Sequence, residues 1–279
     1  MDVRTLLRWP LWALSGRFRK AAYARARPWL AKRGPCVLRC SGILMEVDFS
    51  ENGDYRLFVR GKLESAVQAV ILSVLAPGAT FFDVGANRGY FALLAADRAG
   101  PGGRAWAFEP EPENTKRIRR NFALNPGLAV TLEPVAVSSM AGEATFMAGD
   151  NSGHGSIVEG FEVAAGRPIT VPTVSLDGYL EENGIDRVDV MKMDIEGAEV
   201  QAIEGMASGL PAGRYGDIII EWHGSHHGEL GTRPAQALEL LVSSGYDLFV
   251  IERRRKTEPI KPEAVPAERV HLFCRASRS

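Results

Sequence analysis

Apolar and polar residues alternate along most of this chain with two different periods. Short apolar runs, which predict buried strands, recur between stretches whose apolar residues are spaced three or four apart, which predict amphipathic helices. The seven predicted strands are TFFDV, RAWAFE, AVTLEPVAV, VDVMKMD, DIIIEWH, YDLFVIE and VHLFCR. Strands and helices in this order form a mostly parallel sheet that is covered by helices on both faces. We therefore expect an α/β fold of the Rossmann-like kind over residues 61–279.

Two regions depart from this alternation. In residues 35–60 the runs VLRC and ILMEVDF are separated by turn residues, and they predict a small β-meander ahead of the sheet. After the third strand, GEATFMAG predicts a hairpin and DNSGHGS a loop. The chain thus divides into an N-terminal extension (residues 1–34), a lead-in (35–60) and one domain (61–279).

The N-terminal extension differs from the rest of the chain in charge. The net charge is −1, but residues 1–33 hold nine Lys and Arg against one acid, together with three of the five tryptophans. Pro10 and the scattered arginines interrupt any apolar core that a secretory signal would need. Such a segment can lie in the headgroup layer of an anionic membrane, or its apolar residues can pack on the body. We expect a cytoplasmic protein and leave open whether residues 1–33 contact a membrane.

Composition excludes two further classes. No apolar run approaches the ~20 residues that cross a bilayer, so a soluble body is expected. Cys36, Cys40 and Cys274 are too few for a disulfide framework and lack the partners of a zinc finger.

The turn after the first strand of the sheet carries the first candidate site. In a doubly wound sheet this turn approaches the ligand most closely. Here it reads Gly85-Ala86-Asn87-Arg88-Gly89, with Asp83 ahead of it, and it lacks the three-glycine spacing of nicotinamide sites. A carboxylate at Asp83 would repel a diphosphate but suits an α-ammonium group, as in S-adenosylmethionine. Glu109, which ends the second strand, can bind ribose hydroxyls in either kind of site.

Five stretches, in this order, resemble the FkbM family of S-adenosylmethionine-dependent methyltransferases: DVGANRGYF, AFEP, PVAVSS, SLDGYL and VDVMKMDIEGAE. The resemblance covers roughly residues 61–275. It implies a class I methyltransferase fold and, for most members, methylation of a hydroxyl on a sugar, polyketide or other secondary metabolite. It assigns Ala136-Val137 to the adenine, Glu109 to the ribose, and four residues to the methionine part: Asp83, Gly85, Asn87 and Gly89. Glu64, Ala86, Pro110 and Asp194 complete the expected cofactor site.

The fourth strand, VDVMKMD, predicts chemistry at its carboxyl end. Strand alternation sends Met191 and Met193 to one face and Lys192 and Asp194 to the other. We expect Asp194 to contact ligand or act in catalysis. Glu196 and Glu199 follow at the start of a helix, where capping the helix is an equal alternative to a role in the site.

The fifth strand, DIIIEWH, brings Glu221 and His223 to the same edge and face, where they can converge with Asp194. Methyl transfer to oxygen requires alignment of the partners and removal of a proton, and a histidine or carboxylate of near-neutral pKa suits that task. We expect Asp194 and His223 to be catalytic and Lys192, Glu196 and Glu221 to contact substrate. The alternative is that Asp194, Glu221 and His223 hold a divalent metal, which is less favoured. His154, His226 and His227 are assigned to solvated loops.

The function expected is O-methyl transfer from S-adenosylmethionine to a small-molecule or glycan acceptor. The alternatives are an NAD(P)-dependent oxidoreductase on a similar sheet and a non-catalytic cofactor-binding protein of the membrane surface. We expect no nucleic-acid partner. Acceptor contacts are expected from the loops at residues 149–168 and 223–233.

Overall fold

A computed structural model of the chain describes residues 25, 27–50, 54, 57, 60–148, 167–224, 233–252 and 257–277. Most of the basic N-terminal extension therefore lies outside the described residues, as do His154, His226, His227 and nearly all of the two expected acceptor loops. The predictions made for them stay predictions. None of the described helices combines the length and the apolar character needed to cross a membrane.

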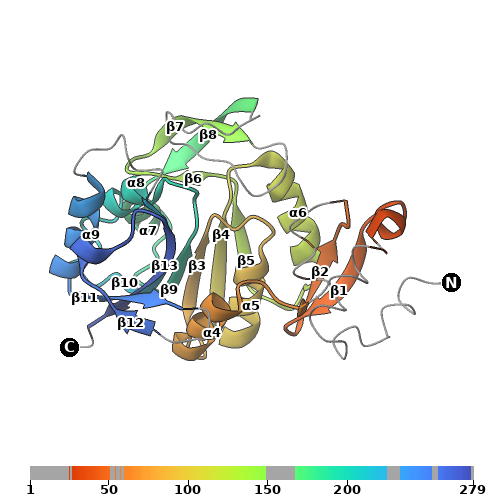
Figure 1. The fold of residues 1–279 in the computed structure, drawn as a ribbon, viewed down its shortest axis with the longest axis horizontal. Coiled ribbons are helices and arrows are strands. Elements are labelled where there is room, and N and C mark those ends of the chain that lie inside the picture. The colour runs from red at the N-terminus through yellow and green to blue at the C-terminus, as the bar shows by residue number, and fades with distance from the viewer. Residues whose placement is uncertain are drawn as a thin grey trace.

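The core of the protein is an eight-stranded sheet (Figure 1). Its strands, in spatial order, are β12 (Thr257–Pro259), β11 (Tyr246–Ile251), β13 (Arg269–Ala276), β10 (Tyr215–His223), β9 (Val188–Met193), β3 (Thr80–Val84), β4 (Arg104–Phe108) and β5 (Val130–Glu133). The five strands from β10 to β5 pair in parallel, and β13 runs antiparallel to both of its neighbours. The predicted seven-stranded, mostly parallel sheet is confirmed, and β12 adds a three-residue strand at the edge.

Helices cover both faces of this sheet. The helices that flank the sheet include α4 (Ser65–Val74), α5 (Tyr90–Ala99), α6 (Pro112–Ala123), α7 (Leu176–Glu182), α8 (Glu199–Glu204) and α9 (Arg233–Ser243), and a 3-10 turn, η3, spans Pro262–Ala264. Alternate strand residues feed two separate cores, as the period of two requires. Phe81 packs with α4, α5 and α6, whereas Phe82 packs with α7, α8 and α9.

The lead-in differs from its prediction. Residues 36–47 form a two-stranded antiparallel hairpin, β1 (Cys36–Cys40) and β2 (Ile43–Val47), and the described residues 54, 57 and 60 are helical. The lead-in is therefore not a meander of strands alone, because Leu57 reaches the core from a helical segment. The hairpin packs beside α6 (Figure 1), where Asn121 and Asn125 accept hydrogen bonds from the backbone of β2 at 2.7 and 2.9 Å.

A second, three-stranded sheet lies beyond the carboxyl ends of the large one (Figure 1). It consists of β6 (Ala136–Val137), β8 (Arg167–Val174) and β7 (Gly142–Ala148) in that order. Two predictions are corrected here. The run AVTLEPVAV divides into β5 and β6, which belong to different sheets, and GEATFMAG is one strand, which pairs with β8 and does not fold back on itself.

Candidate active site

The turn between β3 and α5 brings the ends of two strands together. Gly85 has a φ of 78°, and a Cβ on it would overlap the backbone carbonyl of Asp194 at the end of β9. Only glycine combines this conformation with such an approach. Gly89, with a φ of 73°, instead lies against α6, where a Cβ would stand 2.8 Å from the ring of Phe122. The two glycines of the turn thus have different roles.

Glu109, at the end of β4, is fixed against this turn. Its Oε2 accepts a hydrogen bond from the backbone amide of Asn87 at 2.7 Å, and its Oε1 accepts one from the amide of Glu111 at 3.0 Å. Burial raises the pKa of Glu109 to about 7, although these two hydrogen bonds act to lower it. A buried carboxylate with its oxygens held in this way presents its remaining lone pairs in fixed directions.

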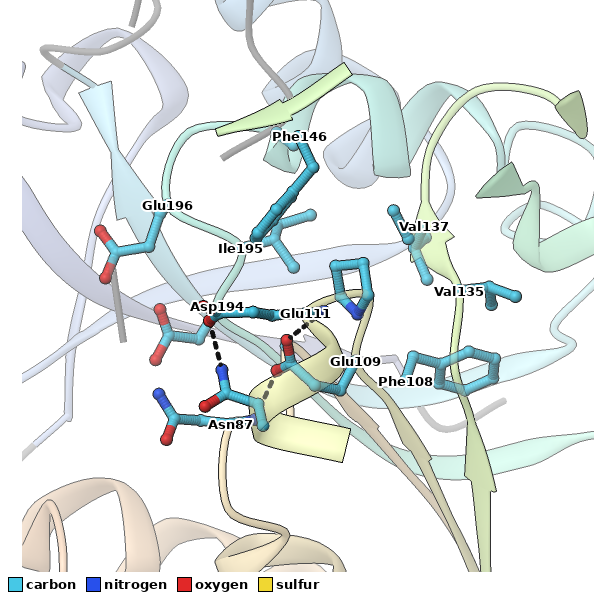
Figure 2. Close-up of a pocket in the computed structure, with 15 residues that line it drawn as sticks. Asn87, Phe108, Glu109, Glu111, Val135, Val137, Phe146, Asp194, Ile195 and Glu196 are labelled. Atoms are coloured by element: carbon cyan, nitrogen blue, oxygen red, sulfur yellow. Dashed lines mark hydrogen bonds between the residues drawn. The ribbon is translucent and has the colours of Figure 1, made fainter. Parts of the chain in front are cut away.

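A pocket opens between the turn, Glu109 and the small sheet (Figure 2). Its apolar wall includes Phe108, Val135, Val137 and Ile195, and Phe146 points into it from β7 (Figure 2). Four of the described residues that line it are carboxylates, namely Glu109, Glu111, Asp194 and Glu196, and none is Lys, Arg or His. The turn's own cation, Arg88, is buried and paired with Asp54, which does not line the pocket. The pocket is thus strongly acidic.

The structure divides the predicted cofactor and substrate residues into two groups. Those that line the pocket are Gly85, Asn87, Glu109, Pro110, Ala136, Asp194 and Glu196. Those that do not are Glu64, Asp83, Ala86, Gly89, Lys192, Glu221 and His223. Asp83 in particular is buried, accepts a hydrogen bond from the amide of Ala92 at 2.9 Å, and pairs in register with Lys192. Burial raises the pKa of Asp83 to about 7.

Asp194 connects the pocket to a buried network of charges. Lys192 and Asp194 lie on one face of β9, as strand alternation predicts, and Lys192 Nζ is 3.0 Å from Asp194 Oδ2. Burial alone would raise the pKa of Asp194, but the charge of Lys192, a hydrogen bond with Glu221 and the charge of His223 lower it to about 2. Asp194 is therefore ionised at neutral pH, and both Glu221 and His223, which were predicted to converge with it, act on its pKa.

His223 is held between two carboxylates. Its Nδ1 lies 2.9 Å from Oε1 of Glu199, and its Nε2 lies 3.2 Å from Oε2 of Glu196. Burial would lower the pKa of His223, but these two contacts outweigh it and raise the pKa to about 10. Glu196 has a φ of 51° and precedes the helix, which begins at Glu199, so Glu196 does not cap it. A charged imidazole of this kind does not suit the predicted role of general base.

Sequence reasoning missed several residues of the site. His271 and Arg269 on β13 pair in register with Glu221 and His223, and Arg269 forms an ion pair with Glu221. His271 Nε2 is 3.4 Å from Glu64 and 3.6 Å from Glu221. Burial and the charge of Asp194 raise the pKa of Glu221 to about 7. The run VHLFCR predicts the strand that holds His271, but only its antiparallel register with β10 brings His271 and Arg269 to this edge.

In the pocket, sequence reasoning also missed Glu111 and Asn114. Asn114 donates a hydrogen bond to Glu111 at 2.9 Å, while its Oδ1 is buried and accepts none. Both residues lie within five positions of Glu109 in the stretch EPEPEN, so the sequence predicts that they lie near the end of the second strand.

Comparisons with known proteins identify the family of this chain. The methyltransferase FkbM domain family matches residues 83–248. The chain is similar to the hexuronic acid methyltransferase AglP of Haloferax volcanii, with 25% identity over 72% of this chain and 81% of that one. It is also similar to the 2-O-methyltransferase NoeI of Sinorhizobium fredii, with 30% identity over 50% of this chain and 62% of the relative.

A further relative is the 31-O-demethyl-FK506 methyltransferase FkbM of Streptomyces tacrolimicus, which is 30% identical over 47% of this chain and 61% of its own. The chain thus spans less than two thirds of two of these three relatives. A solved S-adenosylmethionine-dependent O-methyltransferase from Thermotoga maritima aligns with 88% of this chain and 86% of its own at 11% identity and a TM-score of 0.43. By the match that spans residues 83–248, this chain belongs to the FkbM family of S-adenosylmethionine-dependent methyltransferases.

Proposed function

We propose that this chain is an O-methyltransferase that transfers a methyl group to a hydroxyl of a sugar, a glycan or glycolipid, or a secondary metabolite. The observation that carries the proposal is the acidic pocket beside the Gly85 turn, in which four carboxylates and no described cation line the wall. Such a wall repels the pyrophosphate of a dinucleotide and favours a ligand with net positive charge. S-adenosylmethionine, with a sulfonium, an ammonium and one carboxylate, is such a ligand.

The residues of the pocket fit this cofactor. Glu109 would accept hydrogen bonds from the ribose hydroxyls, and the apolar wall around Ala136 and Val137 would take the adenine. The Oδ1 atom of Asn114 is buried beside this wall without a donor, which supports a bound N–H or O–H group there. When bound, the cofactor supplies a methyl group on a sulfonium, which is already a good leaving group.

The protein then has to orient the acceptor hydroxyl and remove its proton. Asp194 lines the pocket, is ionised, and can accept the hydrogen bond of that hydroxyl. The charge of Asp194 acts on Glu221, whose pKa is near 7, so Glu221 suits the storage of the proton better than His223 does. We therefore assign proton removal to Asp194 and Glu221 and not to Asp194 and His223.

Oxygen as the acceptor atom is supported by the relatives. Two of them are named for O-methyl transfer, and a third is named for a hexuronic acid. A carboxylate at the pocket suits a hydroxyl because it accepts the O–H hydrogen bond directly.

The test begins with calorimetric titration of the full chain with S-adenosylmethionine and with NAD. We expect binding of S-adenosylmethionine at one site and NAD binding roughly 100-fold weaker, because phosphate charges would face the carboxylates. Tight binding of NAD alone would refute the proposal. A screen for transfer of labelled methyl groups to polar extracts, lipids and glycans then identifies the acceptor. Label that survives mild base on an ether oxygen supports O-methyl transfer, and label recovered only on nitrogen or carbon contradicts it.

A further inference from the structure

A buried ammonium group lies among the carboxylates behind the pocket. Lys192 projects from the middle of the sheet, has a side chain that is 4% exposed, and lies over the ring of Phe91 with Nζ 5.0 Å from the ring centre. The negative charges of four carboxylates act on this ammonium group, namely those of Asp194, Glu64, Asp83 and Glu221. Lys192 Nζ lies 3.0 Å from Oδ2 of Asp194, so the two side chains form a buried ion pair.

Three of these carboxylates, Asp194, Glu64 and Glu221, belong to groups of side chains that are spaced as metal ligands would be. Two groups of three described side chains have ligand atoms within 4.8 Å of one another, Asp194 with Glu196 and His223, and Glu64 with Glu221 and His271. The predicted metal set of Asp194, Glu221 and His223 is divided between these two groups. Carboxylates at this spacing repel one another unless a cation lies between them.

Each group already has a protein cation next to it. Lys192 Nζ is 3.0 Å from Asp194, and Arg269 is paired with Glu221. Both ring nitrogens of His223 face carboxylates, Nδ1 that of Glu199 at 2.9 Å and Nε2 that of Glu196 at 3.2 Å, so neither nitrogen faces an open position for a metal ion. A divalent ion in the group of Asp194 would have to displace Lys192, whose side chain cannot swing into solvent, since β9 lies between β3 and β10.

We propose that the ammonium of Lys192 occupies the cation position of this site, so that it holds Asp194 in place at the pocket and the enzyme works without a divalent metal. Lys192 is thus a positioning residue that acts through Asp194, and not a substrate contact. The positioning of Asp194 for catalysis rests on the proposed function, whereas the occupation of the cation position by Lys192 does not. Occupation of the cation position can be tested without any acceptor or cofactor.

The test replaces Lys192 and asks whether a metal takes its place. The full chain and its Lys192→Ala variant are titrated by calorimetry with Mg²⁺, Mn²⁺ and Zn²⁺, each metal alone. We expect the wild-type protein to bind none of them tightly, and the variant to bind Mn²⁺ or Zn²⁺ with an affinity higher by ~100-fold or more, because one buried positive charge has been removed. Lys116→Ala is the control, since Lys116 is exposed and paired with one carboxylate, Glu113.

Two results would overturn the proposal. One is a metal bound to the wild-type protein at one equivalent and lost on Glu221→Gln. The other is a Lys192→Ala variant that binds metal no better than the wild type. If that variant does not fold, the double variant Lys192→Ala, Asp83→Asn keeps the buried charge balanced, and the same two comparisons apply to it. S-adenosylmethionine titration of the wild type reports separately on the proposed function, because a chain that fails to bind the cofactor can still meet or fail the metal test.

Discussion

The imidazole of His223 lies 2.9 Å from Glu199, with Nδ1 facing Oε1 of a carboxylate whose side chain has no exposed surface. Glu199 also accepts a hydrogen bond from the amide of Gly197 at 3.0 Å. The histidine therefore neutralises a buried charge and links β10 to the start of α8 and to the loop that carries Glu196. His223 therefore has a structural role in this part of the fold.

The first prediction concerns the stability that His223 provides. His223→Ala removes the imidazole that lies against the buried carboxylate of Glu199, and we expect a loss of about 3–5 kcal/mol in the free energy of unfolding near pH 6. The folded pKa of about 10 lies above the ordinary 6.5, so the stabilisation is fully present below pH 6.5 and is lost as the pH rises through about 10. Urea unfolding of both proteins at pH 6, 8 and 10 measures this. A difference that does not shrink toward pH 10 would contradict the assigned charge.

The second prediction separates two effects at Gly85. Gly78 and Gly85 have the same φ of 78°, but a Cβ at Gly78 meets nothing within 4 Å, whereas one at Gly85 overlaps the carbonyl of Asp194. We expect Gly78→Ala to cost about 1 kcal/mol, the ordinary strain of a left-handed alanine, and to leave S-adenosylmethionine binding unchanged. Gly85→Ala should cost more and abolish binding. Thermal unfolding and calorimetry distinguish the two variants, and equal effects would remove Gly85 from the site.

The third prediction concerns Glu109. A glutamine there presents an amide NH₂ to one of the two backbone N–H groups that now donate to the carboxylate. We expect Glu109→Gln to weaken S-adenosylmethionine binding by roughly 10- to 100-fold, the usual effect of losing hydrogen bonds to a charged group. Glu113→Gln is the matched control, because the Glu113 side chain is 74% exposed on the next helix. Unchanged affinity in Glu109→Gln would place the ribose elsewhere.

Periodicity predicted the parts of this site that lie on single strands. The alternation in VDVMKMD placed Lys192 and Asp194 on one face, and their 3.0 Å contact follows from it. The glycine turn after TFFDV and the acid after RAWAF also lie together, because parallel strands that begin βα units end at one edge of the sheet. Local pattern and sheet topology together are enough for these residues.

What the sequence could not predict depends on pairing between distant elements. His271 reaches Glu221 only through the antiparallel register of β13 with β10, and a single strand pattern does not state its register. The strand β8 was missed because it carries Pro168 and Pro172, which count against a strand. β8 tolerates both prolines because β6 pairs with it only at Thr173 and Val174. On the side of β8 that faces β6, Pro168 and Pro172 therefore have no strand partner.

The charge state of His223 was out of reach for the same reason. It depends on Glu199, which is 24 residues away in sequence, and on the left-handed backbone at Glu196 that turns its carboxylate toward the ring. An isolated histidine of ordinary pKa would suit a general base, and only the two carboxylates beside it change that interpretation.

The last prediction concerns the pH dependence of methyl transfer. Glu221 faces Asp194, Glu64, Arg269 and His271, and its pKa of about 7 results from burial and the charge of Asp194, partly offset by His271 and Arg269. If Glu221 takes up the acceptor's proton through Asp194, it must be ionised beforehand, so kcat should fall as the pH drops below about 7. Glu221→Gln should lower kcat by about 10²–10⁴-fold, the usual contribution of a general base, and remove this dependence.

Glu109 also titrates near pH 7, so the two groups have to be separated. Glu109 acts on cofactor affinity, which calorimetry measures at each pH without an acceptor, whereas Glu221 acts on kcat at saturating cofactor. The profile is measured with an acceptor from the labelling screen, for the wild type, Glu221→Gln and Glu109→Gln. We expect the acid limb of kcat to persist in Glu109→Gln and to vanish in Glu221→Gln. A limb that persists in both variants would exclude Glu221 as the proton acceptor, because no titration of its side chain would then control the rate.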